Sequence, residues 1–293
     1  MDAALADLLV LLSLERLEAD LYRGTSRDIG NPQVFGGQVL GQALMAASGT
    51  VENRIVHSLH AYFLRAGDFN LPIVYEVDRS RDGASFSSRR VVAIQNGLQI
   101  FHMSASFQSP ESGLEHQIAM PQVPPPESLP KRSDWVNSPL VTDELQRRFF
   151  NRVRPFDIRP VGMEKLLNGQ PKDPQLHVWF RATDPLPDGE ALHRGLLAYV
   201  SDYYLLMTAA LPHGIAFPSG SVRFASIDHA MWFHRSVRVD DWLLYSIDSP
   251  SSSGARGLAR GSIFSRDGRL VASTAQEGLM RVMTEGRAKN KER

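Results

Sequence analysis

Apolar and polar positions divide the chain into two similar series of elements. In the first half, the apolar segment Gly37–Ala47 predicts a buried helix. It is followed by segments that are bounded by turn sequences such as Arg-Asp-Gly and Gln-Asn-Gly, a pattern typical of strands joined by hairpins. The predicted strands of this half are residues 57–64, 72–79, 85–95 and 99–108.

The second half repeats this order. An apolar helix is predicted for residues 191–211, and the strands after it are residues 222–234, 242–248, 256–265 and 269–281. Segments that lie 170 residues apart also match, because Ile73–Asp78 (IVYEVD) falls on Leu243–Asp248 (LLYSID). Residues 63–65 and 100–106 match their counterparts at the same offset, and three segments in one register indicate an internal duplication.

A proline-rich segment separates the two halves. Five prolines lie between positions 121 and 130, and proline is excluded from helix interiors and central strands. We therefore expect an N-terminal domain over residues 1–110, a linker with a short helix (141–152) over residues 111–152, a C-terminal domain over residues 153–286 and a polar tail over residues 287–293.

The order of elements also predicts the fold. A chain of 293 residues is long enough for two domains. Long strands joined by tight hairpins form one antiparallel sheet, and a helix that is apolar on all sides has to be enclosed by that sheet. The expected fold class is α+β: two fused hotdog domains, each an antiparallel sheet wrapped around a central apolar helix, with the two sheets joined edge to edge.

Composition limits the chemistry that this chain can perform. Without cysteine it has no disulfide, no thiolate nucleophile and no cysteine metal site. Lys plus Arg and Asp plus Glu number 32 each, so no overall field would hold nucleic acid or an anionic membrane, and any anion has to be bound locally. The apolar run Leu8–Leu14 is shorter than the roughly 18 residues of a membrane-spanning helix. We expect a cytoplasmic protein without a nucleic-acid or membrane partner.

One carboxylate stands at an unusual place in the predicted helix of the second half. Asp202 is the only acidic residue among residues 196–207, and its neighbours on the helix surface are apolar or aromatic. Burying a carboxylate is costly unless hydrogen bonds or a partner compensate. Asp202 is therefore a candidate functional residue, and a structural carboxylate bonded to a backbone amide or a tyrosine is the alternative.

Two polar residues on later strands are further candidates. Val222, Phe224 and Ser226 alternate along one predicted strand, which places the hydroxyl of Ser226 on the apolar face toward the helix. Gln276 lies on the last strand. Taken alone, Ser226 is better explained as a small residue in a tight contact between helix and sheet, and an exposed edge position is the alternative for Gln276.

Other catalytic and binding motifs do not fit. The chain lacks the Gly-x-Ser-x-Gly turn of α/β-hydrolases, and Gly36–Gly41 does not fit a dinucleotide-binding loop. His57 and His60 would point to opposite faces of a strand, and no acidic cluster flanks them, which argues against a metal pair. We expect no metal and no cofactor, and His57 stays a weak candidate for a supporting role near the site.

Five segments together resemble acyl-CoA thioesterase II, a family of bacterial double-hotdog enzymes whose relatives include the peroxisomal acyl-CoA thioesterases. The resemblance covers nearly the whole chain. Its segments are Val34–Leu44 (VFGGQVLGQAL), His57–Asp68 (HSLHAYFLRAGD), residues 81–91, Ile227–Arg235 (IDHAMWFHR) and residues 273–281.

The resemblance implies hydrolysis of medium- to long-chain fatty acyl-CoA to a free fatty acid and coenzyme A by an activated water. The family's trio of Asp, Ser or Thr, and Gln matches Asp202, Ser226 and Gln276, with Asp202 as general base and the other two holding the water. The first-half counterpart of Gln276 is Ser106, and the first helix carries no acid. We therefore expect the first domain to be a structural partner whose surface helps to form the substrate channel.

Two alternative functions stay open. A hotdog enoyl-CoA hydratase or dehydratase would share the helix-borne Asp, but such enzymes resemble one another in having a His five residues later, where this chain has Met207. A non-catalytic acyl-CoA binding protein is the other. The expected partner is fatty acyl-CoA, and the resemblance implies a homo-oligomer, dimer or tetramer. Six arginines are candidates for contacts with the coenzyme A phosphates: Arg65, Arg89, Arg90, Arg235, Arg256 and Arg260.

Overall fold

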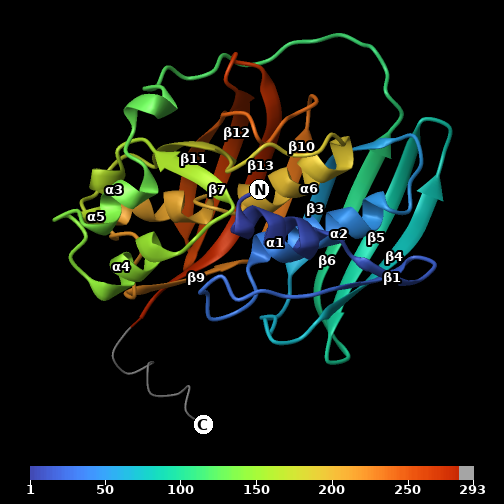
Figure 1. Ribbon diagram of the computed structural model, residues 1–293, viewed down its shortest axis with the longest axis horizontal. Coiled ribbons are helices and arrows are strands. Elements are labelled where there is room, and N and C mark those ends of the chain that lie inside the picture. The colour runs from blue at the N-terminus through green and yellow to red at the C-terminus, as the bar shows by residue number, and fades with distance from the viewer. Residues whose placement is uncertain (284–293) are drawn as a thin grey trace.

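The structure is a computed structural model that describes residues 1–283, and it is built on one antiparallel sheet (Figure 1). The strand order is β1-β2-β4-β5-β6-β3-β10-β13-β12-β11-β8-β7, and β9 also pairs with β13. The first half contains β1 (Glu15–Glu18), β2 (Leu21–Gly24), β3 (Ile55–Phe63), β4 (Ile73–Asp82), β5 (Phe86–Gln95) and β6 (Leu98–Gln108). The second contains β7 (Phe156–Pro160), β8 (Gln175–Ala182), β9 (Val222–Ser226), β10 (Asp228–Phe233), β11 (Leu243–Ser253), β12 (Arg256–Ser265) and β13 (Leu270–Val282).

Two helices lie side by side on one face of this sheet (Figure 1). They are α2 (Gly36–Ser48) and α6 (Glu190–Ser201), which contact each other, while α2 also packs on β3 to β6. Most side chains of both helices are buried, as the all-round apolar pattern predicts. The other helices are α1 (Ala3–Leu12), η1 (Pro126–Ser128), α3 (Arg132–Val136), α4 (Glu144–Asn151), α5 (Met163–Leu167) and η2 (Leu206–His213).

The two halves join through one edge strand of each. β3 and β10 pair antiparallel, with Leu59 opposite Met231, so that the sheets of the halves meet edge to edge. This confirms the predicted fold class of two hotdogs, each with an antiparallel sheet around an apolar helix. Because the halves share one sheet and one hydrophobic core, the domain boundaries that we expect at residues 110 and 153 stay a prediction.

The prediction of one helix over residues 191–211 is wrong. α6 ends at Ser201, Asp202 is its C-cap, and the chain continues as the 3-10 helix η2 only from Leu206. Between them Tyr204 has a φ of 65°, in the left-handed region that an α-helix cannot contain. The apolar pattern does not show this break, because the residues of α6 and η2 are both largely buried.

The prediction of one strand over residues 222–234 is also wrong, because it divides at Ile227 into β9 and β10. Both pieces pair with β13, but the register shifts by one residue, from Ser226 opposite Gly278 to Ala230 opposite Ala275. An irregularity of this kind bends a strand and redirects its side chains. Here it lies directly beside one of the candidate residues.

The proline-rich linker crosses the sheet of the second half. Its residues Met120 and Val123 pack on a small cluster formed by Trp179, Trp242, Leu244 and Phe264. The short helix predicted over residues 141–152 corresponds to α4. Among the described residues, no helix has both the length and the apolar character needed to cross a membrane.

Candidate functional site

The structure brings the three predicted site residues together. Asp202 Oδ1 accepts hydrogen bonds from Gln276 Nε2 at 2.7 Å and from Ser226 Oγ at 3.3 Å. The Asp202 side chain is 6% exposed and Gln276 is 1% exposed, so that the group lies below the surface. The carboxylate is therefore compensated by hydrogen bonds, as its burial requires.

Irregular backbone positions these side chains. Asp202 caps α6 at the point where the helix ends, and Ser226 is the last residue of β9, directly before the break at Ile227. Gln276 stands on β13, where Thr274 and Gln276 alternate on the buried face. The three residues thus come from a helix end, a strand end and a central strand.

The first half also contributes to the site, through the N-terminus of α2. The backbone N–H of Gly37 donates to Asp202 Oδ2 at 2.9 Å. Asp202 lies at the C-terminal end of α6, where the helix dipole disfavours negative charge, and the N-terminal end of α2 offsets this effect. The expectation that the first domain supplies only structure and channel surface was therefore too narrow.

Glycine is required at this N-terminus because the two central helices approach closely. A Cβ on Gly36 would lie 2.7 Å from Asp202 Oδ2, and a Cβ on Gly37 would lie 2.2 Å from the carbonyl oxygen of Tyr199. A side chain at Gly36 would displace the Asp202 carboxylate, and one at Gly37 would require the backbone to move. The sequence Gly36-Gly37 therefore permits the contact between α2 and the carboxylate.

His229 is a fourth member of the site, which we did not predict. It is fully buried, and Gln276 Nε2 lies 3.1 Å from its Nδ1. On the other side, Ser201 Oγ lies 3.0 Å from Nε2 and donates its own proton to the carbonyl of Ala198. Nε2 must therefore carry the proton and Nδ1 must accept, which defines a neutral imidazole. Burial lowers the pKa of His229 to about 4, in agreement with a neutral ring.

A signal for His229 was present in the sequence. On β10, His229, Met231 and Phe233 alternate and all three are buried, so the histidine stands on the apolar face of a strand. His57, the histidine that we did consider, lies in the first half, where its Nε2 is 2.8 Å from Ser106 Oγ. Among the described residues no hydrogen bond links it to Asp202, Ser226 or Gln276.

A cavity of about 330 Å³ adjoins the site. It is lined by residues of both halves, among them Gly36, Phe63 and Ser226. Its wall is partly apolar, and the described residues that line it include two arginines, Arg65 and Arg223, but no Asp or Glu. The cavity is thus suited to a ligand that has an apolar part and a negative charge.

Five of the six predicted arginines lie away from this cavity. Arg235, Arg256 and Arg260 form ion pairs with Glu115, Glu277 and Asp248. Arg90 is exposed on β5, and Arg89 is buried. Of the six, Arg65 alone lines the cavity.

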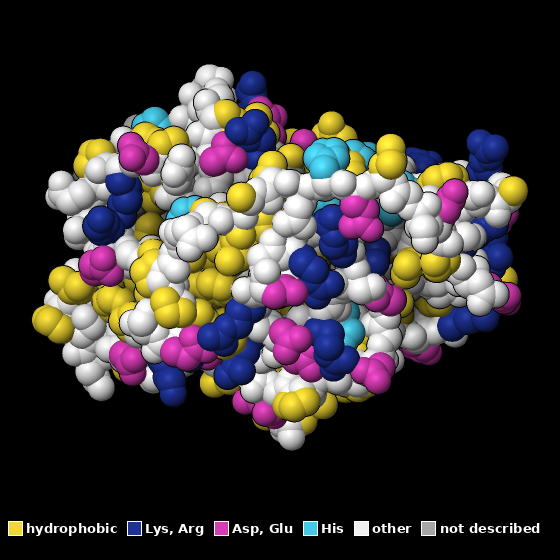
Figure 2. All heavy atoms as spheres, turned by 90° about the horizontal axis from the view of Figure 1, so that it is seen from above, with side chains coloured by type: hydrophobic (Ala, Val, Ile, Leu, Met, Phe, Trp, Pro, Cys, Tyr) yellow, Lys and Arg dark blue, Asp and Glu magenta, His cyan; other side chains and the backbone are white. Residues whose placement is uncertain are grey.

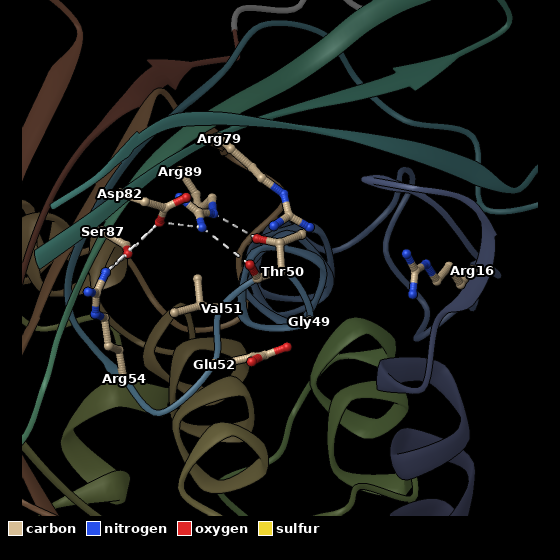
Figure 3. A pocket seen from close by; sticks show the side chains of 10 residues that line it. All are labelled: Arg16, Gly49, Thr50, Val51, Glu52, Arg54, Arg79, Asp82, Ser87 and Arg89. Atoms are coloured by element: carbon tan, nitrogen blue, oxygen red, sulfur yellow. Dashed lines mark hydrogen bonds and ion pairs between the residues drawn. The ribbon is translucent and has the colours of Figure 1, made fainter. Parts of the chain in front are cut away.

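Arg89 lines a different, larger cavity of about 540 Å³ at the C-terminal end of α2 (Figure 3). Its guanidinium donates to Thr50 Oγ1 and to the Thr50 carbonyl, and it forms a 2.7 Å ion pair with Asp82. These bonds use its donors on a helix end and a neighbouring strand. Arg89 is therefore a structural residue, contrary to the expectation that it is a candidate for phosphate binding.

The described residues hold no evident metal centre. No group of three or more His, Cys, Asp or Glu among residues 1–283 is arranged to hold a metal ion. The site itself brings together the Asp202 carboxylate, the Ser226 hydroxyl, the Gln276 amide and the His229 imidazole.

Comparisons with known proteins identify the kind of enzyme. A family model described as acyl-CoA thioesterase matches residues 145–279, and a model of the acyl-CoA thioesterase N-terminal domain matches residues 24–108. The chain is 42% identical over 283 residues to acyl-CoA thioesterase 2 of Haemophilus influenzae, covering 96% of this chain and 99% of the relative. It is 43% identical to human acyl-coenzyme A thioesterase 8, covering 93% and 88%.

Solved structures agree with the sequence relatives. A crystal structure of an acyl-CoA thioesterase II from Mycobacterium marinum superimposes with a TM-score of 0.77 at 44% identity, covering 95% of this chain and 98% of the other. A protein from Alicyclobacillus acidocaldarius, described as having a hot dog fold, has a TM-score of 0.76 at 18% identity, which supports the fold alone. With its relatives covering nearly its whole length, the chain belongs to the acyl-CoA thioesterase family and is a thioester hydrolase.

Proposed function

We propose that Asp202 is the general base of this hydrolase and activates a water molecule held by Ser226 and Gln276. The observation that supports this role is the convergence of the Ser226 hydroxyl and the Gln276 amide on one oxygen of a buried carboxylate. A positioned water and a nearby base are sufficient to hydrolyse a thioester, because sulfur donates little resonance to the carbonyl and leaves it reactive. General base catalysis typically contributes a factor of roughly 10² to 10⁴.

The Gln276 amide has an open acceptor that suits this proposal. Its Nε2 donates to both Asp202 and His229, whereas its Oε1 is buried and has no partner among the described residues. An unpaired buried carbonyl costs about 1–3 kcal/mol. A bound water that donates one proton to Gln276 Oε1 and the other to Asp202 would satisfy this oxygen.

The N-terminus of α2 is suited to stabilise the developing oxyanion. The first N–H groups of a helix have no acceptor within it, and Gly36, the first residue of α2, lines the cavity. A backbone N–H in this position stabilises a negative oxygen without a catalytic side chain. In this proposal the N-terminus of α2 donates a hydrogen bond to the base through Gly37 and stabilises the oxyanion of the transition state through Gly36.

The same geometry disfavours a hydratase or dehydratase. Met207, five residues after Asp202, offers no acid–base group, and it lies in η2 rather than in the helix of Asp202. His229 cannot take its place, because both of its ring nitrogens are already engaged with Gln276 and Ser201. Water addition to an enoyl-CoA would therefore lack a second catalytic group.

The substitution Asp202→Asn tests the base. We expect kcat to fall by roughly 10² to 10⁴, because the charge is lost while the size is kept, and we expect the fold to persist. Thiol release from acyl-CoAs of increasing chain length measures this and also tests the proposed preference for medium to long chains. If the variant kept nearly full activity and its melting temperature fell by several degrees, Asp202 would be a structural carboxylate instead. Thiol release by the wild type excludes a non-catalytic acyl-CoA binding protein.

A water mechanism also predicts the absence of an acyl-enzyme. Mass spectrometry of protein quenched during turnover should show an unmodified chain, whereas an acyl adduct on Ser226 would overturn the proposal.

We extend the proposal to a cytoplasmic homo-oligomer, dimer or tetramer, as the resemblance implies. Light scattering coupled to size exclusion measures the assembly, and a monomer at working concentration would contradict it.

A further inference from the structure

The cavity beside the site has a positive rim that the catalytic trio does not use. Arg65 follows β3 in the first half and Arg223 lies on β9 in the second, and both side chains are exposed. Among residues 1–283 neither forms an ion pair. None of the described residues that line this cavity is a carboxylate, so the two guanidinium groups keep most of their donors for a ligand.

The internal duplication supplies a natural comparison for Arg65. Its counterpart in the second half is Arg235, and the two are anchored alike: Arg65 Nη1 donates to the Gln99 carbonyl at 2.6 Å, and Arg235 Nη1 donates to the Leu270 carbonyl at 2.8 Å. Arg235, however, is paired with Glu115 of the linker at 3.3 Å. Arg235 is thus neutralised and does not line the cavity, whereas Arg65 lines it and has no acidic partner among the described residues.

Arg223 has a second cation next to it, Arg281, which forms no ion pair with any residue of the described range 1–283. In the pairing of β9 with β13, Arg223 stands directly opposite Arg281. Like charges directly opposite on neighbouring strands are destabilising. A bound anion would remove this repulsion, and the pair adds to the positive potential at the mouth of the cavity.

We propose that Arg65 and Arg223 bind the phosphate groups of the coenzyme A part of the substrate, with Arg281 adding to the local field. This assignment rests on the proposed function. Arginine matches the geometry of phosphate oxygens through two parallel N–H donors. In this arrangement the two exposed arginines, one from each half, hold the nucleotide end of the substrate. The thioester end extends through the same cavity to Asp202 and the N-terminus of α2.

Two substrates with the same acyl chain test this assignment. One is the acyl-CoA, and the other is the acyl-N-acetylcysteamine thioester, which keeps the thioester but has no phosphate. For Arg65→Gln combined with Arg223→Gln, we expect the KM for acyl-CoA to rise tenfold or more with little change in kcat. We expect both constants for the phosphate-free thioester to stay unchanged, and Arg235→Gln, the matched control, to leave both substrates unaffected.

A calorimetric titration with coenzyme A and with pantetheine provides a readout independent of turnover. The double variant should bind coenzyme A at least tenfold more weakly and pantetheine as well as the wild type does. Added salt should weaken coenzyme A binding more for the wild type than for the double variant, which keeps only Arg281. Equal losses for both ligands, or no loss for either, would overturn the phosphate assignment. Failure of the proposed function is distinct, because Asp202→Asn would then still hydrolyse the phosphate-free thioester.

Discussion

Within the site, His229 determines which way the Gln276 amide points. Its Nδ1 is a fixed acceptor, since Nε2 has to donate to Ser201, and only the nitrogen of the amide can satisfy both Nδ1 and the Asp202 carboxylate. The Gln276 oxygen is thereby directed to the remaining side. The first half has Leu59 and Ser106 at the corresponding positions, which shows that the fold itself requires neither a histidine nor an amide there.

His229→Leu separates this role from packing. Leu59 occupies the same place in the first half fully buried, so we expect the variant to fold. Loss of one orienting hydrogen bond, worth about 0.5–1.5 kcal/mol, should lower kcat by roughly two- to tenfold and leave KM nearly unchanged. His229→Asn, which keeps an acceptor near the position of Nδ1, should restore part of the rate in steady-state thiol-release assays. Unchanged kcat in the leucine variant would contradict the role.

The neutral histidine also predicts how stability depends on pH. Its folded-state pKa of about 4 lies below the ordinary value of 6.5, so between these values the unfolded chain binds a proton that the native protein does not. Stability contributed by the neutral form is thus present above pH 6.5 and lost as the pH falls toward 4. Asp202 Oδ1 lies 4.0 Å from Nδ1 and acts to raise the pKa of His229, but burial has the larger effect.

Urea unfolding at pH 7 and pH 5 measures this effect. The wild type should be less stable at pH 5, and His229→Leu should show a smaller difference between the two pH values. The difference should not vanish, because burial also lowers the pKa of other histidines, His57, His177 and His234. If the free energy of unfolding changed equally with pH in the wild type and the variant, groups other than His229 would cause the pH dependence.

At the level of elements, the site depends on the close crossing of α2 and α6. Gly37→Ala places a methyl group 2.2 Å from the Tyr199 carbonyl, which pushes the helices apart and breaks the bond from Gly37 N–H to Asp202. Although alanine favours a helix by about 1 kcal/mol over glycine, we expect a melting temperature lower by several degrees and a kcat reduced more than tenfold. Gly113→Ala, with no atom within 4 Å of the added carbon, is the matched control.

The elements that the sequence predicted well are those with a regular pattern. Helix α2 and the strands from β3 to β6 and β11 to β13 follow the expected periodicity and the duplication. The breaks after Ser201 and at Ile227 were missed, because apolar side chains flank both and only backbone geometry distinguishes them. The outer strands of the sheet, β1, β2, β7 and β8, were missed as well, since they have no duplicated partner at the 170-residue offset.

The site shows the same division. Asp202 was identified from a carboxylate in an apolar helix, whereas Ser226 and Gln276 needed the family resemblance. Gly37 could not be predicted as a contact of Asp202, because the two are 165 residues apart and meet only through the packing of two helices. Arg223 has no counterpart in the duplicated motif, and it enters the site only because β9 bends beside β13.

The molecule as a whole has no net charge that would attract an anion over a long range. Charges of both signs are interspersed over the face seen in Figure 2, in agreement with equal numbers of acidic and basic residues. An anionic substrate therefore has to be recognised by a local group such as Arg65 and Arg223 rather than by a long-range field. The junction of the halves is the place where such a local group adjoins the carboxylate and the end of α2.

That junction also makes the two halves one cooperative unit. A single hydrophobic core cluster runs from Leu5 to Ala272, and β3 pairs directly with β10. All four tryptophans lie in the linker or the second half, at positions 135, 179, 232 and 242. Tryptophan fluorescence consequently reports on the linker, the second half and, through Trp232 beside His60, the junction, while circular dichroism reports on the whole chain.

Leu44→Ala, a change in the fully buried face of α2, tests this coupling from the first half. A cavity of this kind costs about 2–5 kcal/mol. If the shared sheet and core make unfolding cooperative, the urea midpoint measured by tryptophan fluorescence should fall by as much as the midpoint measured by circular dichroism, in one transition. Leu114→Ala, at an exposed linker position, should move neither. A fluorescence midpoint that stays at the wild-type value while the circular dichroism splits into two transitions would show that the halves unfold independently, and that the contact of Gly37 with Asp202 does not couple them.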